Sequence, residues 1–220
     1  MKKGKVLFFA VFLAMVAALS AVTFYYWYNS YNYVITENAY VDGTIFKVGP
    51  QVAGEYLEIF VDEGDRVRAG QIVARQSEAT LAPGAAADLT VIRAPVAGTV
   101  IKRQAQPGEV GSPGLPVVWL CDLSRVYVTA NVEEGRLGLV RPGQQVDIWI
   151  DGYSGRVFAG RVSSVGEATN ATFSMLPVRT TSGSFTKVIQ TVPVKISIEP
   201  VLDRELRLGV NARVRIHVRG

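Results

Sequence analysis

The residues that most often do chemistry in proteins are few in this chain and far apart. His217 is the single histidine and Cys121 the single cysteine among 220 residues. One imidazole and one thiol at such distance do not form the His, Cys and carboxylate clusters that hold zinc. A serine–histidine–acid triad would have to use His217, the single histidine. No phosphate-binding or dinucleotide-binding motif occurs. We therefore expect no catalytic residues, no metal and no cofactor.

Both residues fall in segments that are typical of structural roles. Cys121 lies in the apolar run VVWLCDL, which predicts a buried thiol that packs as a small hydrophobic side chain. A single cysteine excludes a disulfide within the chain. His217 lies in an expected strand over residues 213–218, and the acidic pairs at 62–63 and 133–134 are typical of solvated surfaces.

Residues 6–28 form an uncharged apolar segment that predicts a membrane-spanning helix. At about 1.5 Å per residue such a helix crosses a hydrocarbon core of about 30 Å. Three lysines precede the segment, so the positive-inside rule predicts a cytoplasmic N-terminus and an exported remainder. An aromatic cluster that suits the lipid headgroup zone ends the segment: Tyr25, Tyr26, Trp27 and Tyr28.

A cleaved signal peptide is the alternative interpretation of this segment. Residues 18–21 read ALSA and resemble a cleavage site, but the apolar run is longer than the usual signal region and continues beyond them. We therefore expect a retained anchor. The lysines before the anchor account for most of the formal net charge of +4, and no basic stripe predicts nucleic-acid binding.

An internal repeat at an offset of 44 residues organises the region after the anchor. The tripeptide Val-Ala-Gly at 52–54 recurs at 96–98, and two further glycines recur in the same register. Glycine supplies the positive φ that turns between β-branched strands require. Neither half has enough strands to bury its own apolar face, so the halves should pack together. Chance recurrence of turn glycines is the alternative. The glycines expected to shape the turns are Gly54, Gly64, Gly70, Gly98, Gly108 and Gly114.

The two halves resemble those of a biotinyl/lipoyl-type domain. VAGEYLEIFVDEGDRVRAGQIVARQ is similar to the first half and IRAPVAGTV, followed by GEVGSPGLPVVWL, to the second. Carrier domains of that type are acylated on a hairpin lysine, and the hinge here, residues 76–90, contains no lysine. The sequence therefore excludes a covalent biotin or lipoyl carrier.

Split lipoyl halves also occur in the membrane fusion protein family, the periplasmic adaptors of export pumps. YVDG at 40–43, LSRVYVTANVEE at 123–134, QTVPVKI at 190–196 and LGVNARV at 208–214 resemble its EmrA-like multidrug branch in the same order. This resemblance covers about residues 36–218 and implies an adaptor that assembles on an inner-membrane transporter as a trimer or hexamer. It also implies multidrug efflux or secretion, with the energy source and the substrate pocket in the transporter.

The chain departs from that family where a long α-helical hairpin usually separates the lipoyl halves. In this chain only the twelve residues 77–88 occupy that position. As a continuous helix they would extend at most about 18 Å. Pro83-Gly84 interrupts even that, so we expect a tight loop. The chain should be unable to reach a distant outer-membrane channel by itself. An inactive degenerate copy is the alternative.

The C-terminal half predicts a small β-barrel. Apolar residues alternate with polar ones over 126–131, 146–151, 192–199 and 210–218, as in strands with one buried face. A short helix is expected over 133–140 and ends before Pro142-Gly143. Short strands with turn signals between them favour a closed or nearly closed barrel.

A long loop over residues 165–186 interrupts the barrel strands. Its apolar residues either fold back on the barrel or form a surface that docks on the transporter. The candidate partner contacts are Phe173, Met175, Leu176 and Phe185.

The sequence thus predicts an all-β part outside the cytoplasm, made of a lipoyl/biotinyl-like β-sandwich and a small β-barrel, behind one transmembrane helix. The expected domains are the tail and anchor (1–28), a linker and first strand region (29–46), the lipoyl-like domain (47–122, with halves 47–76 and 91–122 joined by loop 77–90) and the barrel (123–220). The expected location is the inner membrane, with the N-terminus cytoplasmic and the bulk periplasmic or otherwise extracytoplasmic. A stand-alone anchored envelope module without a transporter is the alternative function.

Overall fold

The structure, a computed structural model, describes residues 2–80, 86–153, 155–173, 189–199 and 206–219. The chain forms two compact units. One consists of Met1–Tyr40, Val128–Glu199 and Val210–Gly220, and the other of Val41–Tyr127 and Pro200–Gly209. The first unit holds a helix and a barrel, and the second a two-sheet domain.

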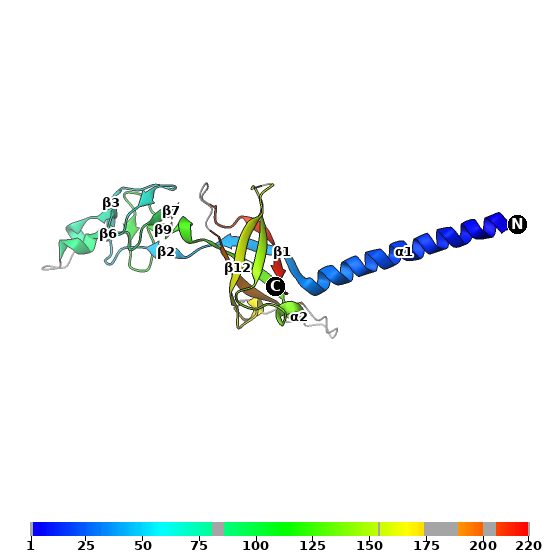
Figure 1. The fold of residues 1–220 in the computed structure, drawn as a ribbon. Helices are drawn as coiled ribbons and strands as arrows, with labels where there is room; N and C mark the ends of the chain where they lie inside the picture. Colours follow the sequence, from blue (N-terminus) through cyan, green and yellow to red (C-terminus); the bar gives the residue numbers. More distant parts are fainter. Residues whose placement is uncertain (1, 81–85, 154, 174–188, 200–205, 220) are drawn as a thin grey trace, which may run out of the picture. The chain divides into compact units, whose positions relative to one another are not determined.

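Helix α1 runs from Lys2 to Asn32 as one continuous element at the N-terminal end (Figure 1). Its interior lacks proline, and all backbone groups along it can bond within the helix, as a membrane span requires. A candidate span covers Val11–Asn32, and none of its most apolar window is buried inside the protein. The helix is longer at both ends than the expected segment 6–28, and no proline or glycine between Tyr28 and Asn32 ends it earlier.

The second unit consists of two four-stranded sheets. One has the order β2-β9-β7-β4 and the other β6-β5-β3-β8. The strands of the first half of the repeat are β2 (Ile45–Val48), β3 (Gly54–Ile59), β4 (Arg66–Val67) and β5 (Ile72–Gln76). Those of the second half are β6 (Val91–Arg93), β7 (Gly98–Arg103), β8 (Val110–Gly111) and β9 (Val118–Cys121). Each sheet therefore contains two strands from each half.

Hydrogen bonds between the halves obey the 44-residue offset. The Gly64 N–H donates to Val100 O at 2.8 Å, and the Gly108 N–H donates to Tyr56 O at 2.8 Å. The pairing of Val67 with Gly98 likewise matches the pairing of Gly111 with Gly54. An internal two-fold relation thus exchanges the two sheets, and neither half makes a complete sheet without the other.

A shared core fills the space between the two sheets. It takes fully buried side chains from both halves of the repeat, including Val73, Val100, Val117, Val118 and Leu120. Two short 3₁₀ turns, η1 (Glu78–Thr80) and η2 (Ala87–Thr90), flank the connection between the halves. The middle of the expected tight loop, residues 81–85, lies outside the described residues.

The barrel is closed and has the strand order β1-β10-β13-β12-β11-β14. Its strands are β1 (Tyr33–Asp42), β10 (Tyr127–Glu133), β11 (Gln145–Ile150), β12 (Phe158–Val165), β13 (Thr191–Ile198) and β14 (Asn211–His217). The predicted alternation is confirmed, since the inward positions of β10, β11, β13 and β14 are buried and the others are not. Strand β1 precedes the two-sheet unit in the chain but pairs with β14 in the barrel.

Three short helical turns complete the described chain. The 3₁₀ turn η3 (Leu123–Arg125) leads into the barrel, and Asp122 caps it by accepting a hydrogen bond from the Ser124 N–H. Helix α2 (Glu134–Leu137) is shorter than the expected 133–140, because Gly138 ends it. The turn η4 (Asn170–Phe173) follows β12 in the region expected as a long loop.

Candidate functional site

The two residues with the most reactive side chains have structural surroundings. Cys121 is fully buried, as predicted, and burial, followed by the charges of Asp122 and Asp42, raises the pKa of its thiol. A raised pKa keeps the thiol protonated and unreactive. His217 Nε2 lies 2.9 Å from Asp147 Oδ2, and its ring meets Tyr33 edge-on at 5.0 Å between centroids. Among the described residues no group of three potential ligands could hold a metal ion.

The six glycines singled out from the repeat occupy two kinds of place. Gly64, Gly70, Gly108 and Gly114 have φ values of 96°, 80°, 87° and 93°, a region that favours glycine. The remaining two are not turn residues, because Gly54 and Gly98 begin strands β3 and β7. A Cβ at Gly98 would lie 2.8 Å from the Cys121 carbonyl oxygen, so that position requires glycine for close approach of two strands.

The outer face of the β2-β9-β7-β4 sheet carries a cationic and aromatic row. Trp119 on β9 pairs with Lys47 on β2 and with Lys102 on β7. The Lys47 and Lys102 Nζ atoms lie 4.9 Å and 5.5 Å from the Trp119 ring centroid. The Trp119 Nε1 atom is buried and has no hydrogen-bond partner. Two lysine stems therefore cover one indole, and both charges remain at the surface.

The repeat-related face of the other sheet has different chemistry. Arg75 on β5 occupies the place of Trp119 and pairs with Glu58 on β3. Glu55 and Glu58 are both exposed, and exposed apolar side chains flank them at Leu57 and Val110. One outer face is thus basic and the other mixed, although the two backbones are equivalent.

A second stack that the sequence did not predict lies on the outer face of the barrel. The Arg215 guanidinium carbon lies 5.3 Å from the Tyr33 ring centroid and 5.0 Å from that of Trp149. Arg215 Nε is buried and has no hydrogen-bond partner. Alternation had marked Trp149 and Arg215 as outward, but only the strand register brings them together with Tyr33.

The structure describes one of the four predicted partner-contact residues. Phe173 is the last residue of η4. Met175, Leu176 and Phe185 lie outside the described residues, so their contact with a partner stays a prediction.

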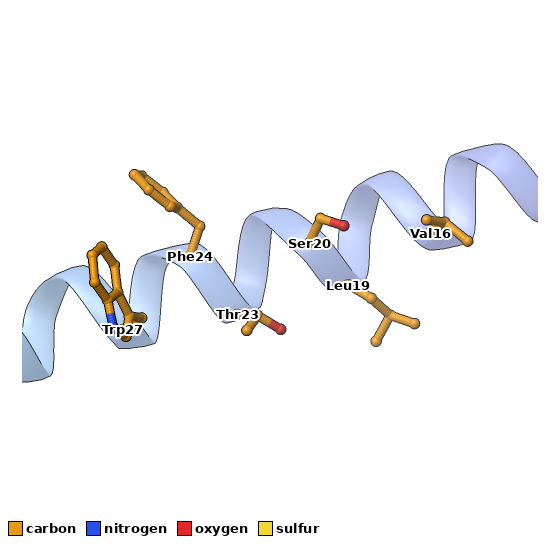
Figure 2. A pocket seen from close by; sticks show the side chains of 6 residues that line it. All are labelled: Val16, Leu19, Ser20, Thr23, Phe24 and Trp27. Atoms are coloured by element: carbon orange, nitrogen blue, oxygen red, sulfur yellow. The ribbon is translucent and has the colours of Figure 1, made fainter.

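An apolar groove runs along the outer surface of α1. Figure 2 shows that all of its side chains project from this one helix. The residues are Val16, Leu19, Ser20, Thr23, Phe24 and Trp27. The Phe24 ring lies 6.3 Å from that of Tyr28, and the Trp27 ring stacks on Tyr31 at 5.3 Å. Such a surface suits contact with acyl chains or with another membrane helix.

The end of α1 is hydrogen-bonded to the end of the barrel. The Val218 N–H donates to Asn32 O at 2.9 Å, and the Arg219 guanidinium lies 3.8 Å from the Tyr31 ring centroid. The first barrel residue, Tyr33, follows the helix directly. The barrel is therefore held at the helix end without a linker.

Comparisons with known proteins agree with this architecture. A model of the CusB-like β-barrel domain family matches residues 125–219. A protein of Bacillus subtilis described as an efflux system component, YhbJ, is 35% identical over 189 residues, which cover 86% of this chain and 81% of that one. The multidrug resistance protein EmrK of Escherichia coli is 35% identical over 147 residues, but the match covers only 38% of its length.

A solved structure supports the fold. It is a MacA–MexA chimera that contains the α-hairpin domain of MexA from Pseudomonas aeruginosa, and it has a TM-score of 0.68 at 18% identity. The match covers 86% of this chain and 82% of that chain. With the lipoyl-like sheets, the barrel, the apolar helix and the match to most of YhbJ, this chain belongs to the membrane fusion protein family, the adaptor subunits of efflux transporters.

Proposed function

We propose that this chain is the anchored, hairpin-less adaptor of an inner-membrane export transporter, with α1 in the membrane, its N-terminus in the cytoplasm and the rest outside it. The lysines at 2, 3 and 5 support this orientation, and the aromatic residues at 25–28 support a membrane interface at that end of α1. The transporter supplies energy and substrate recognition, and this chain contributes an assembly surface. Its expected lack of catalytic residues stays a prediction.

The short connection between the two lipoyl-like halves carries the proposal. Only residues 77–90 join β5 to β6, at the place where the family resemblance implies a long α-helical hairpin. The matched MacA–MexA chimera contains an α-hairpin domain. The chain also covers 81% of YhbJ, which leaves little length there for a long inserted hairpin. A complete two-sheet unit with this short connection favours a distinct adaptor type over an inactive copy. Such an adaptor works without reaching a distant channel by its own hairpin.

We propose further that the chain assembles as a ring, a trimer or hexamer, through unlike faces of the two-sheet unit. One outer face presents Lys47, Lys102 and Trp119, and the opposite one presents Glu55 and Glu58 beside Arg75. Contact between unlike patches on successive copies closes into a ring when the rotation permits it. Opposite charges favour that arrangement over contact between two identical faces.

A deletion strain tests the adaptor function. Removing the gene for this chain should raise the accumulation of at least one toxic compound in a broad panel. The wild-type gene on a plasmid should restore export, and a version that lacks residues 2–32 should not, because it cannot stay at the membrane. Unchanged accumulation of every compound, in a strain that demonstrably expresses the wild-type protein, would favour the stand-alone envelope module.

A further inference from the structure

We propose that the end of the barrel that is attached to α1 docks on the surface of the bilayer that α1 crosses. The docking surface, called the barrel-end surface below, consists of residues 133–141, Ile189 and Arg219. Its occupant is the lipid surface itself, with its phosphate groups and upper acyl chains. The inference rests on the proposed function in one respect, namely that α1 spans a membrane.

Chain connectivity places this end of the barrel at the lipid headgroups. Tyr28 is the last residue of the aromatic cluster, α1 ends at Asn32, and β1 begins at Tyr33. Four further helical residues advance the chain by only about 6 Å. The polar headgroup layer on each side of the hydrocarbon core is about as thick. The first barrel residue therefore starts within or just above the headgroups.

A chain of hydrogen bonds ties residues 133–141 to the same place. The Val218 N–H donates to Asn32 O at 2.9 Å, which fixes the end of β14 on the end of α1. Gln144 Nε2 donates to Val218 O at 3.3 Å and to Leu139 O at 3.0 Å. One amide thus joins the segment around Leu139 to the barrel end that continues into α1.

Apolar side chains protrude from this surface. Leu139 is 44% exposed and Ile189 is 69% exposed. The Glu134 N–H donates to Gln190 O at 3.0 Å, which brings Ile189 next to the start of α2. Single exposed apolar residues are common on soluble proteins, so exposure alone indicates nothing. Here the two side chains lie beside the membrane, so that the upper acyl chains can bury them.

Three arginines accompany the apolar residues on the barrel-end surface. Arg136 and Arg141 are exposed, and Arg219 lies against the Tyr31 ring at the end of α1. Guanidinium groups bind phosphate oxygens in pairs. Glu133 and Glu134 occupy the same segment and offset most of the positive charge. Docking should therefore depend on apolar insertion more than on anionic lipid.

The anchor makes a weak surface contact sufficient. Because α1 holds the barrel at the bilayer, docking is an intramolecular step with a high effective concentration of lipid. A few partly inserted side chains would not hold a free protein on a membrane, but they can orient a tethered one. The consequence is a fixed tilt of the barrel on the membrane before any transporter binds.

The test uses the full-length protein, without a transporter, in phosphatidylcholine vesicles. An environment-sensitive fluorophore is attached to Leu139→Cys or, as a matched control, to Val157→Cys. Val157 is also an exposed apolar barrel residue, but it precedes β12 at the other end, near the Tyr40–Asn211 pair. That end is roughly 20 Å away along the strands. Native Cys121 is fully buried and should not react, which the unsubstituted protein checks.

We expect brominated acyl chains to quench the label at position 139 and aqueous iodide to quench the label at position 157. The acyl-chain quenching should be at least about twofold stronger at 139, as for a side chain at the headgroup boundary. Adding phosphatidylglycerol should increase it only slightly, and Arg136→Gln with Arg141→Gln should remove that increase. Equal iodide access at 139 and 157 would overturn the docking proposal.

A third label, at Phe12→Cys in α1, separates the two ways in which the proposal can be wrong. If position 12 is quenched by acyl chains and position 139 only by iodide, the anchor holds and the docking does not. If position 12 is also in water, α1 does not span the bilayer. In that case both the docking and the membrane-anchored adaptor are wrong.

Discussion

The backbone N–H of Gly64 donates a hydrogen bond of 2.8 Å to the carbonyl oxygen of Val100, which lies in the other half of the repeat. Gly64 has a φ of 96°, so the turn that presents this N–H requires a residue that tolerates positive φ. The second half repeats the contact from Gly108 to Tyr56. A turn in one half therefore completes a sheet that begins in the other.

A valine at position 64 should destabilise this unit through the backbone. A Cβ at this position would have no other atom within 4 Å, so the cost comes from the positive φ and not from a clash. We expect Gly64→Val to lower the free energy of unfolding by about 1–3 kcal/mol. Gly64→Asn should cost less, because asparagine tolerates positive φ better. Denaturant unfolding of the full-length protein in detergent measures both, and an unchanged midpoint for Gly64→Val would contradict the turn assignment.

Gly98→Ala should be costly for a different reason. Its Cβ would lie 2.8 Å from the Cys121 carbonyl oxygen and 3.0 Å from the Cys121 carbonyl carbon, so β7 and β9 must separate. We expect a loss of about 1–3 kcal/mol of stability. Gly135→Ala in α2 is the matched control, because open space surrounds its Cβ and alanine favours helix. Equal stability of the two variants in the same unfolding assay would argue against the close approach.

Arg215 and Arg213 lie two residues apart on β14 and should respond differently to truncation. Arg215 packs between Tyr33 and Trp149, so Arg215→Ala should cost about 1–2 kcal/mol of unfolding free energy. Arg213 forms an exposed ion pair with Glu37, so Arg213→Ala should cost less than about 1 kcal/mol. Thermal unfolding of both variants decides this, and a larger shift for Arg213→Ala would be evidence against the stack.

Stability should fall as the pH rises through the alkaline range. Burial raises the pKa of Cys121 above its ordinary value of 9.0, so the unfolded chain releases this proton first. The unfolded state then binds fewer protons than the folded state, and the free energy of unfolding decreases with pH above about 9. Burial also raises the pKa of Tyr56 above 10.0, so this residue adds to the loss of stability at still higher pH.

Cys121→Ala isolates the contribution of the thiol. Unfolding free energies, measured from neutral pH into the alkaline range, should fall less steeply with pH in this variant than in the wild type. The absolute stability also changes because a buried side chain is truncated, so only the two slopes are compared. Identical slopes would show that the thiol does not contribute.

The ring arrangement predicts that exchanging charges changes assembly. Lys47→Glu with Lys102→Glu should weaken association of full-length copies by about tenfold or more, because the new glutamates would then meet Glu55 and Glu58. Adding Glu55→Lys and Glu58→Lys should restore it. Arg68→Glu, an exposed residue of the same unit, is the control. Light scattering in detergent measures the mass, and an unaltered mass for the double variant would exclude this interface.

The sequence predicted most of the fold because the decisive signals are local. The 44-residue offset follows from turn glycines such as Gly64 and Gly108, and the barrel strands follow from apolar residues at alternate positions. The exchange of strands between sheets was not predictable in detail. The offset predicts that β3 corresponds to β7. That β3 pairs with β8 follows only from long-range hydrogen bonding, which the sequence does not reveal.

The surfaces were harder to predict than the strands. The Lys47, Trp119 and Lys102 row depends on the register of three strands, and the Arg215 stack depends on that of β1, β14 and β11. Gln144 bridges Leu139 and Val218, and its hydrogen bond to Val218 joins residues that are 74 positions apart in the sequence. No spacing in the sequence signals such contacts, because each side chain alone is an ordinary surface residue.

Purification of the tagged full-length protein from its native membrane in mild detergent tests the adaptor function most directly. Mass spectrometry identifies and quantifies what co-purifies. We expect a multi-spanning transporter in a fixed ratio to this chain, and less of it when the charge-reversed faces weaken assembly. Recovery of this chain alone, under conditions that keep known membrane complexes intact, would be evidence against an adaptor and would favour a stand-alone envelope module.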